Sequence, residues 1–440
     1  MRYAIIGNGV AGTTAAFTLR AREPGAEITL ISAESDYFFS RTALMYAYMD
    51  RMSRRDLEPY ERKVYAKQNL RLLCDRVTDL DASRLLLTLE SGRALEYDRL
   101  LLATGSVGDR PNWPGLDEAH EGVVHFVTLD DLDRCERLTP STRQAVVVGG
   151  GLIGVELVEC LVYHRKQVTF LVRSPGYWPG ALAGEESAMV SEHIRRHGVD
   201  LRADEGVARV LADEGGRVRA VQTQSGAEFP CQLLGIAIGV VPAVDWLRQV
   251  KTPPRIERGI VVSSSFETSL ENVWAAGDCA EFLHDGRSTV EQLWYSARRQ
   301  GELAARAMLG DPVRYELPIF YNSAKFFEIE YTSTGIVDPS IEGTRSFFCR
   351  LPGKQASVRI VERAGAVVGF NMLGSRWNHT FFERWITERR DLDYVVEHLR
   401  EAQFDVEFGR VDLAPVHATY RDWKAALHPW PALPRGSGFV

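Results

Sequence analysis

The chain has 440 residues, of which 45% are hydrophobic and 25% are charged, and its net charge is -7 at pH 7. The composition is that of a globular protein, and at about 100–200 residues per domain the length predicts roughly two to four domains. The acidic balance and the lack of a long Lys/Arg run argue against nucleic acid as a partner. No apolar stretch reaches the ~18 residues of a membrane-spanning helix, so we expect no integral membrane association.

Neither targeting nor metal-binding signals stand out. The first apolar strand begins at residue 3, which leaves no room for a signal peptide and predicts a cytoplasmic protein. We find no Cys-x-x-Cys pair and no His cluster at metal-ligand spacing, so we expect no metal site and reduced, mostly buried thiols. The six cysteines are scattered at positions 74, 135, 160, 231, 279 and 349.

Residues 3–6 are predicted to form a buried strand, and Gly7, Gly9 and Gly12 follow it in Gly-x-Gly-x-x-Gly spacing. In such a motif the first glycine allows a tight turn, the second lets the backbone approach a pyrophosphate, and the third lets the helix pack closely. A helix pattern over residues 13–21 completes the unit, whose N-terminus would attract phosphate. A glycine turn in another kind of α/β protein is the alternative.

The next segments continue an α/β pattern. Residues 28–31 form an apolar strand that is followed by Glu34, and residues 35–49 read as an aromatic loop running into a helix. Leu44, Met45 and Tyr48 could simply face the core. Residues 55–68 have a polar, helical pattern.

Short alternating segments at residues 70–73 and 84–89 predict a small antiparallel ribbon. Residues 97–105 then give an apolar strand ending in Ala-Thr-Gly, the kind of strand end at which open α/β sheets bind ligands. The Pro- and Gly-rich residues 106–122 predict a linker.

The opening pattern then recurs. Residues 145–148 predict a strand, residues 149–154 repeat the glycine fingerprint, and a helix over 155–163 leads to a strand over 167–172. Two fingerprints in the same context imply two dinucleotide sites. The second strand ends at Arg173 rather than at an acid, which favours NADPH over NADH unless this arginine is an ordinary surface residue.

The middle of the chain closes this unit and returns to apolar strands. A helix is predicted over 185–197, a pair of strands around Gly215 and Gly216, and a buried strand that begins at Leu233 and ends at Gly239. Residues 272–278 form a strand ending in Gly-Asp, where the acid requires a bonding partner. Residues 291–306 are strongly helical.

Residues 311–440 contain 20 of the 43 aromatic residues, so they should form their own core. Short strands are predicted at 326–331, 346–350, 358–361 and 367–374, and helices at 380–387 and 392–400. The proline-rich tail after Leu413 is predicted to be irregular.

These blocks, in this order, resemble the two-dinucleotide flavoprotein family: the pyridine nucleotide-disulfide oxidoreductases and their ferredoxin reductase, NADH oxidase and apoptosis-inducing-factor-like relatives. The resemblance rests on the two fingerprints and on the blocks at 103–105, 239–242 and 276–278. It implies an α/β fold with two Rossmann-like domains, the NAD(P) domain inserted in the FAD domain, and a C-terminal α+β domain. The expected boundaries are 1–110 and 246–310 for FAD, 111–245 for NAD(P)H, and 311–440 for the last domain.

By the resemblance, the first fingerprint binds FAD and the second binds NADPH or NADH. The residues expected at FAD are Gly7, Gly9, Val10, Gly12, Glu34, Arg41, Thr42, Val77, Ala103, Thr104, Gly105, Gly277, Asp278, Leu293 and Trp294. Those expected at the nicotinamide nucleotide are Gly149, Gly151, Leu152, Ile153, Gly154, Glu156, Arg173 and Gly239. The residues expected to take part in catalysis are Glu156, Trp294 and Tyr46.

The sequence departs from the family where the chemistry is decided. Disulfide reductases and single-cysteine oxidases carry cysteine on the helix facing the flavin, but residues 35–50 contain none. Ferredoxin reductases usually carry a lysine there, and Met45 or Tyr46 stands in its place. Glu156 could therefore need another partner, or be an ordinary solvated helix residue.

The resemblance predicts an FAD-dependent NAD(P)H oxidoreductase in which hydride passes from nicotinamide to flavin N5. Without a thiol, electrons would go directly to an acceptor: a ferredoxin- or rubredoxin-like carrier, a quinone, dioxygen or a small molecule. The alternative is a flavin-containing regulatory or interaction protein with slow turnover. A homodimer through the last domain would be unsurprising.

Overall fold

The computed structural model describes residues 1–284, 287–338, 340–404, 407 and 411–427. Its chain divides into two compact units. The first unit contains Met1–Arg173 and Gly198–Pro318, and the second contains Ser174–His197 and Ile319–Val440. The segment 174–197, which the sequence prediction places in the nucleotide domain 111–245, thus belongs to the second unit. The four-part division of the sequence stays a prediction.

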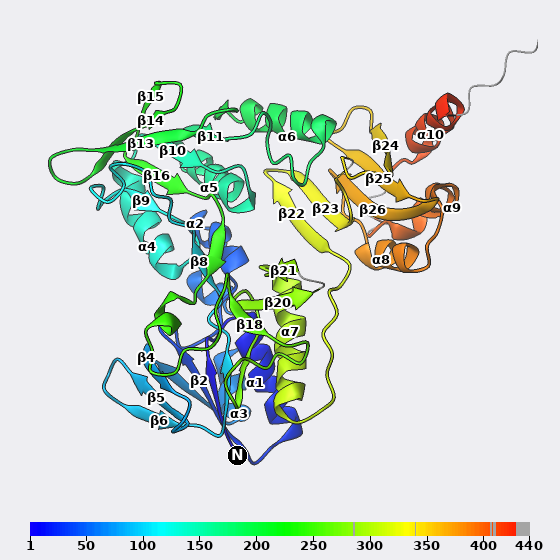
Figure 1. Ribbon diagram of the computed structural model, residues 1–440. Helices are drawn as coiled ribbons and strands as arrows, with labels where there is room; N and C mark the ends of the chain where they lie inside the picture. The colour runs from blue at the N-terminus through cyan, green and yellow to red at the C-terminus, as the bar shows by residue number, and fades with distance from the viewer. Residues whose placement is uncertain (285–286, 339, 405–406, 408–410, 428–440) are drawn as a thin grey trace, which may run out of the picture. The chain divides into compact units, whose positions relative to one another are not determined.

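A five-stranded parallel sheet forms the base of the first unit (Figure 1). Apart from the edge strand at residues 70–74, which is partly exposed, its strands are apolar and mostly buried, as expected for parallel strands covered on both faces. In spatial order they are β19 (Val273–Ala275), β7 (Arg99–Leu102), β1 (Arg2–Ile6), β2 (Glu27–Ser32) and β3 (Leu70–Cys74).

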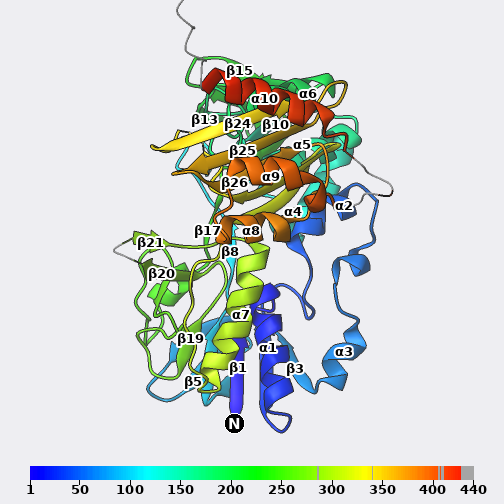
Figure 2. The same cartoon turned by 90° about the vertical axis from the view of Figure 1, so that its right-hand side faces the viewer.

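Helices α1 (Val10–Arg22) and α7 (Trp294–Met308) lie side by side against this sheet (Figure 2). Their close approach depends on Gly301, because a Cβ atom there would lie 2.2 Å from the carbonyl oxygen of Ala11. This packing places the N-terminal ends of both helices near the carboxyl edge of the sheet.

One strand prediction is wrong in its pairing. Residues 70–73 belong to β3, which pairs in parallel with β2 and not with an antiparallel ribbon. A short alternating segment fits either kind of edge strand, so its pattern could not distinguish the two. The antiparallel ribbon does exist, but it consists of β4 (Val77–Asp81), β5 (Leu86–Leu89) and β6 (Ala94–Glu96).

A second five-stranded parallel sheet repeats the pattern in the same unit. In spatial order its strands are β12 (Asp200–Arg202), β11 (Gln167–Leu171), β10 (Gln144–Val148), β16 (Leu233–Ile236) and β9 (Val123–Val124). The helices α4 (Leu129–Leu138) and α5 (Leu152–Tyr163) pack beside it. The two predicted crossovers therefore form two Rossmann-like sheets.

Smaller elements complete the first unit. The predicted linker contains a strand, β8 (Ser106–Gly108), which pairs with β17 (Val240–Pro242). The remaining strands are β13 (Val207–Ala212), β14 (Val218–Thr223), β15 (Glu228–Pro230), β18 (Ile260–Val262), β20 (Ala280–His284) and β21 (Arg287–Thr289). The short helices are α2 (Leu44–Tyr48), α3 (Arg62–Lys67) and the 3-10 turns η1 (Arg41–Ala43), η2 (Arg54–Leu57), η3 (Thr139–Ser141) and η4 (Asp245–Arg248).

The second unit is built on an antiparallel sheet with its own aromatic core. In spatial order the strands are β22 (Tyr321–Phe326), β23 (Ile329–Gly335), β26 (Ala366–Leu373), β25 (Ser357–Arg363) and β24 (Thr344–Arg350). The helices of this unit are α6 (Gly184–Arg196), α8 (His379–Thr387), α9 (Leu392–His398), η5 (Leu399–Ala402) and α10 (Ala414–Leu427).

Two predictions for this unit are wrong. The segment 326–331 is not one strand, because the turn between β22 and β23 falls at residues 327–328. Residues 414–427 are helical, not irregular. Pro415 lies in the first turn of α10, where a missing N–H costs no intrahelical bond. The tail prediction for residues 428–440 lies outside the described residues.

The alternation of side chains across this sheet separates an apolar face from a charged one. Phe370 on β26 stacks on Phe382 of α8 with ring centroids 4.1 Å apart. On the opposite face, Arg359 on β25 donates from Nε to Glu186 of α6 at 2.7 Å. Its guanidinium is 4% exposed and the Glu186 side chain is fully buried. Each charge therefore needs the other to compensate for its lost hydration.

Replacing one partner of this pair should expose its importance for stability. We expect Arg359→Met to lower the free energy of unfolding by about 3–5 kcal/mol, because Glu186 would remain buried without a counter-charge. Arg376→Met is the matched control: its ion pair with Glu330 is also 2.7 Å long but is 69% and 37% exposed. The control should cost below about 1 kcal/mol. Denaturant unfolding of both variants measures the difference, and equal losses would contradict it.

Candidate functional site

The three glycines of the first fingerprint occupy different environments. Gly7 has φ +105°, and a Cβ atom on it would lie 2.0 Å from the carbonyl oxygen of Ala103. A Cβ atom on Gly12 would lie 1.9 Å from the carbonyl oxygen of Gly7. By contrast, apart from its neighbours in the chain, no atom of the described residues lies within 4 Å of the position of a Cβ atom on Gly9. Packing within the protein thus accounts for two of the glycines and leaves the third free for a ligand.

The second fingerprint repeats this arrangement. Gly149 has φ +117°, with the carbonyl oxygen of Ala237 at 2.1 Å from a Cβ position, and Gly154 would meet the carbonyl oxygen of Gly149 at 2.1 Å. Gly151, the counterpart of Gly9, again has open space around its Cβ position. Gly9 and Gly151 are the N-cap residues of α1 and α5, and neither helix has a side-chain cap. Both helix N-termini can therefore receive an anion.

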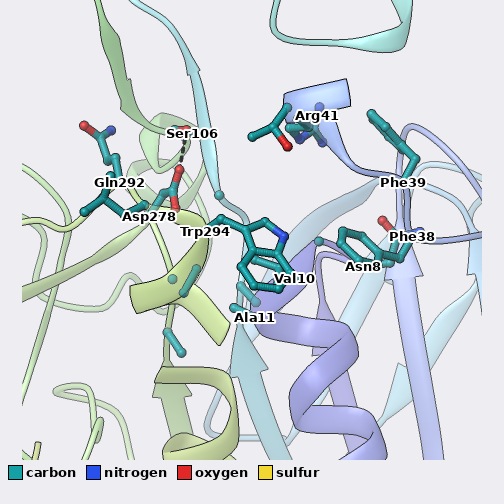
Figure 3. Close-up of a pocket in the computed structure, with 18 residues that line it drawn as sticks. Asn8, Val10, Ala11, Phe38, Phe39, Arg41, Ser106, Asp278, Gln292 and Trp294 are labelled. Carbon is teal, nitrogen blue, oxygen red and sulfur yellow. Dashed lines mark hydrogen bonds between the residues drawn. The ribbon is translucent and has the colours of Figure 1, made fainter. Parts of the chain in front are cut away.

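A cavity of about 180 Å³ opens at the N-terminus of α1 (Figure 3). This volume is below the ~300–1,000 Å³ of typical small-molecule sites, so a whole dinucleotide would also need the surface beyond the cavity. Trp294 lies across the cavity, above Val10. The lining residues are Asn8, Gly9, Val10, Ala11, Phe38, Phe39, Arg41, Thr42, Ala103, Gly105, Ser106, Ala276, Gly277, Asp278, Gln292, Leu293, Trp294 and Ala297.

Asp278 provides a carboxylate in the cavity wall. It follows β19 and accepts a hydrogen bond from the Ser106 hydroxyl at 2.7 Å. Burial raises the pKa of its carboxyl group, which the Ser106 bond partly offsets. The preceding residue, Gly277, donates its N–H to the buried Gln300 side chain of α7 at 2.8 Å. The backbone that carries Asp278 is thus anchored to α7.

Most residues predicted at FAD line this cavity. They are Gly9, Val10, Arg41, Thr42, Ala103, Gly105, Gly277, Asp278, Leu293 and Trp294. Gly7 and Gly12 do not line the cavity, but they permit the close backbone contacts of the turn between β1 and α1. Thr104 lies between two lining residues, and Val77 is buried in the core on β4.

Glu34 is not among the lining residues. Its carboxylate forms an ion pair with Arg41 and accepts the backbone N–H of Leu129 at 2.8 Å. Arg41 also donates to the carbonyl oxygen of Val127 at 2.9 Å. These bonds tie the loop after β2 to the start of α4.

The residues predicted for the nicotinamide nucleotide lie at the second crossover. Leu152, Ile153 and Glu156 are in the first turns of α5, whereas Arg173 is exposed directly after β11. Gly239 has φ +137° and open space around its Cβ position. Of the residues predicted to be catalytic, Trp294 lines the cavity at α1. Tyr46 on α2 and Glu156 do not.

Helix α2 packs against α5. The Cys160 thiol donates to the carbonyl oxygen of Met45 at 3.6 Å, and a ring nitrogen of His164 lies 2.7 Å from the carbonyl oxygen of Tyr48. Met45 is buried in this contact. Helix α2, which the resemblance predicts to face the flavin, therefore contacts the second crossover, and it carries no cysteine.

Several lining residues were missed from the sequence. The aromatic loop was noted but Phe38 and Phe39 were not singled out, and Ser106 was read as part of a linker. Gln292 stands just before α7 without any motif. Its amide donates to the carbonyl oxygen of Val240 at 3.1 Å, a contact between segments far apart in the chain. Their roles follow from tertiary structure, which no local pattern encodes.

Comparison with known proteins identifies the family. The model of the pyridine nucleotide-disulphide oxidoreductase family matches residues 1–301. This chain belongs to that family. It is an FAD-dependent NAD(P)H oxidoreductase with the fold that the sequence predicts.

Similar proteins include reductase components of oxygenase systems. The 5,5'-dehydrodivanillate O-demethylase ferredoxin reductase subunit of Sphingobium sp. is 31% identical over 72% of this chain and 78% of its own length. The benzene 1,2-dioxygenase system ferredoxin–NAD(+) reductase subunit of Pseudomonas putida is 31% identical over 72% and 76%. The putidaredoxin reductase structure, solved as a covalent complex with putidaredoxin, matches with 25% identity and a TM-score of 0.77 over 88% of this chain and 93% of its own.

The family name refers to a disulfide, but the cysteines of this chain are all free thiols. Five are buried, and burial raises the pKa of the Cys231 thiol to about 12. Cys74 is exposed, and it does not line the cavity. Among the described helices, none has the length and apolar character needed to cross a bilayer.

Proposed function

We propose that this oxidoreductase passes electrons from its flavin directly to a small iron–sulfur or rubredoxin-type carrier protein. The observation that carries the proposal is the cavity at α1, which combines a helix N-terminus, an acid and an aromatic side chain but includes no cysteine. A thiol relay through α2 is ruled out by its sequence. Electrons must therefore leave the flavin without an intermediate disulfide.

The residues around the cavity suit the parts of FAD. The open space at Gly9 and the uncapped N–H groups of α1 would receive the pyrophosphate. Asp278 can accept hydrogen bonds from ligand hydroxyl groups, and Trp294 presents an aromatic surface to the flavin side. Bound FAD supplies the hydride acceptor and the electron donor, while the protein supplies orientation and electrostatics.

The nicotinamide nucleotide is assigned to the second crossover. Gly151 has the same open environment as Gly9 and caps α5, so it would approach the second pyrophosphate. Glu156 stands one helical turn further along α5 and would approach the nicotinamide. Tyr46 on α2, the helix packed against α5, would lie near the ring that receives hydride. Holding two reactants in such a site can lower the activation barrier of their reaction by up to ~7–11 kcal/mol.

The relatives support a protein acceptor. The two Sphingobium and Pseudomonas proteins are named as ferredoxin reductases, and the putidaredoxin reductase structure contains its carrier. The name of the Pseudomonas protein also includes NAD(+), whereas Arg173 favours NADPH in this chain. The preference between the two nucleotides, a homodimer through the last domain and a cytoplasmic location remain part of the proposal.

Substituting Gly9 tests the FAD site without disturbing the fold. Gly9→Ala should weaken FAD binding at least about ten-fold, or ~1.4 kcal/mol, because the new methyl group enters the space proposed for the pyrophosphate. Gly25→Ala is the matched control, since its Cβ position is equally open and its backbone is not left-handed. Titration of FAD into the apoprotein measures both, and unfolding curves check that stability changes by less than about 1 kcal/mol. Equal FAD affinity in both variants would contradict the site.

An acceptor panel tests the electron transfer. We expect NADH or NADPH to bleach the flavin in anaerobic buffer, and a ferredoxin or rubredoxin to reoxidise it over many turnovers. Arg173→Ala should lower kcat/KM for NADPH by roughly ten-fold, or ~1.4 kcal/mol, and leave NADH unchanged. Equal effects on both nucleotides would remove the role of Arg173. The regulatory alternative would be favoured if neither nucleotide bleached the flavin, or if no carrier supported multiple turnovers.

A further inference from the structure

Two histidines and a glutamate converge in the second unit, apart from the flavin and nucleotide residues. His193 lies in the last turn of α6, His197 is the C-cap residue of that helix, and Glu328 lies in the turn between β22 and β23. The Nε2 atom of His193 is 3.0 Å from a Glu328 carboxylate oxygen, and the Nε2 atom of His197 is 3.1 Å from the same oxygen. All three ligand atoms lie within 4.8 Å of one another.

The surroundings hold the His197 ring in a defined orientation. Its Nδ1 atom lies 3.0 Å from the backbone carbonyl oxygen of His193, and the ring stacks on Phe327 at a centroid distance of 4.1 Å. Because a carbonyl oxygen only accepts hydrogen bonds, Nδ1 must carry the proton of this bond. In a neutral ring, this bond would leave the lone pair of Nε2 directed at the Glu328 carboxylate. Two electron-rich groups that face each other require a proton or a cation between them.

We propose that His193, His197 and Glu328 bind a first-row divalent cation, with Zn²⁺ the best match. Zn²⁺ takes imidazole nitrogen and carboxylate oxygen as ligands, and a His₂Glu set leaves one position for water. The bond from His197 Nδ1 to a backbone carbonyl is the second contact that metal-ligating histidines usually make. The cation would link α6 to the β22–β23 turn within the second unit.

The two nitrogen–oxygen distances suit a tetrahedral ion. Ligands about 2.0–2.1 Å from a tetrahedral Zn²⁺ are roughly 3.3 Å apart, close to the nitrogen–oxygen distances found here. The His193 and His197 side chains are 12% and 26% exposed, whereas Glu328 is 73% exposed and leaves a route for the ion.

The proposed site departs from the sequence prediction, which found no His cluster at metal-ligand spacing. His193 and His197 are four residues apart, so a helix brings both rings to one face. The third ligand is 131 residues further along the chain, which hid the set from a local search.

The test uses the full-length holoprotein without a histidine tag, treated with a chelator and then titrated with ZnSO₄ against a chromophoric zinc indicator. We expect one Zn²⁺ per chain in the wild type, with affinity at least about ten-fold lower in His197→Ala and Glu328→Gln. His398→Ala is the matched control, because His398 also bonds a backbone carbonyl one turn earlier, that of Tyr394. The control should bind zinc like the wild type.

Thermal unfolding gives a second measurement, since a ligand of the folded state raises the melting temperature. Zinc should raise it for the wild type and His398→Ala but not for Glu328→Gln, whose exposed side chain can change without disturbing the core. Flavin absorbance verifies that each variant is folded. Titrations with MgCl₂ and CaCl₂ serve as baselines. Two results would overturn the proposal: equal zinc binding by the wild type and Glu328→Gln, or no zinc binding by the wild type above these baselines. The result does not depend on the acceptor of the flavin.

Discussion

The site depends on one steric constraint: the backbone of α1 must touch the turn that follows β1. A Cβ atom on Gly12 would lie 1.9 Å from the carbonyl oxygen of Gly7, so any side chain there would push the helix away from the sheet. Gly301 imposes the same constraint on α7, which packs on α1 at Ala11. Through these contacts the uncapped N-terminus of α1 and the strand end at Asp278 come to line one cavity.

The second crossover meets the same constraint with Gly149 and Gly154, and it leaves Gly151 open as the first leaves Gly9. The repetition explains why two sites could be predicted from sequence. Glycines that a backbone contact requires must recur at fixed spacing, and the strands that hold them are apolar because they are buried on both faces. Segments without such a glycine or a strand buried on both faces were predicted less well.

The failures have physical causes. The pairing of β3 depends on which strand lies beside it, and its short alternating pattern carried no information about that neighbour. The proline count of the tail hid α10, in which Pro415 occupies the one turn that tolerates it. Ser106 belongs to the site because its hydroxyl group bonds the Asp278 carboxylate, which is far away in the sequence. Glu328 likewise contacts His197, which is 131 residues earlier in the chain. Such contacts have no local signature.

The central proposal is that electrons leave the flavin without a thiol relay. Its six cysteines are free thiols, five of them buried, and α2 contains no cysteine. Anaerobic reductive titration of the purified holoprotein tests this most directly. The account predicts that complete reduction takes two electrons per bound FAD. Uptake of four electrons, with the appearance of two new thiols, would reveal a redox-active disulfide and contradict it.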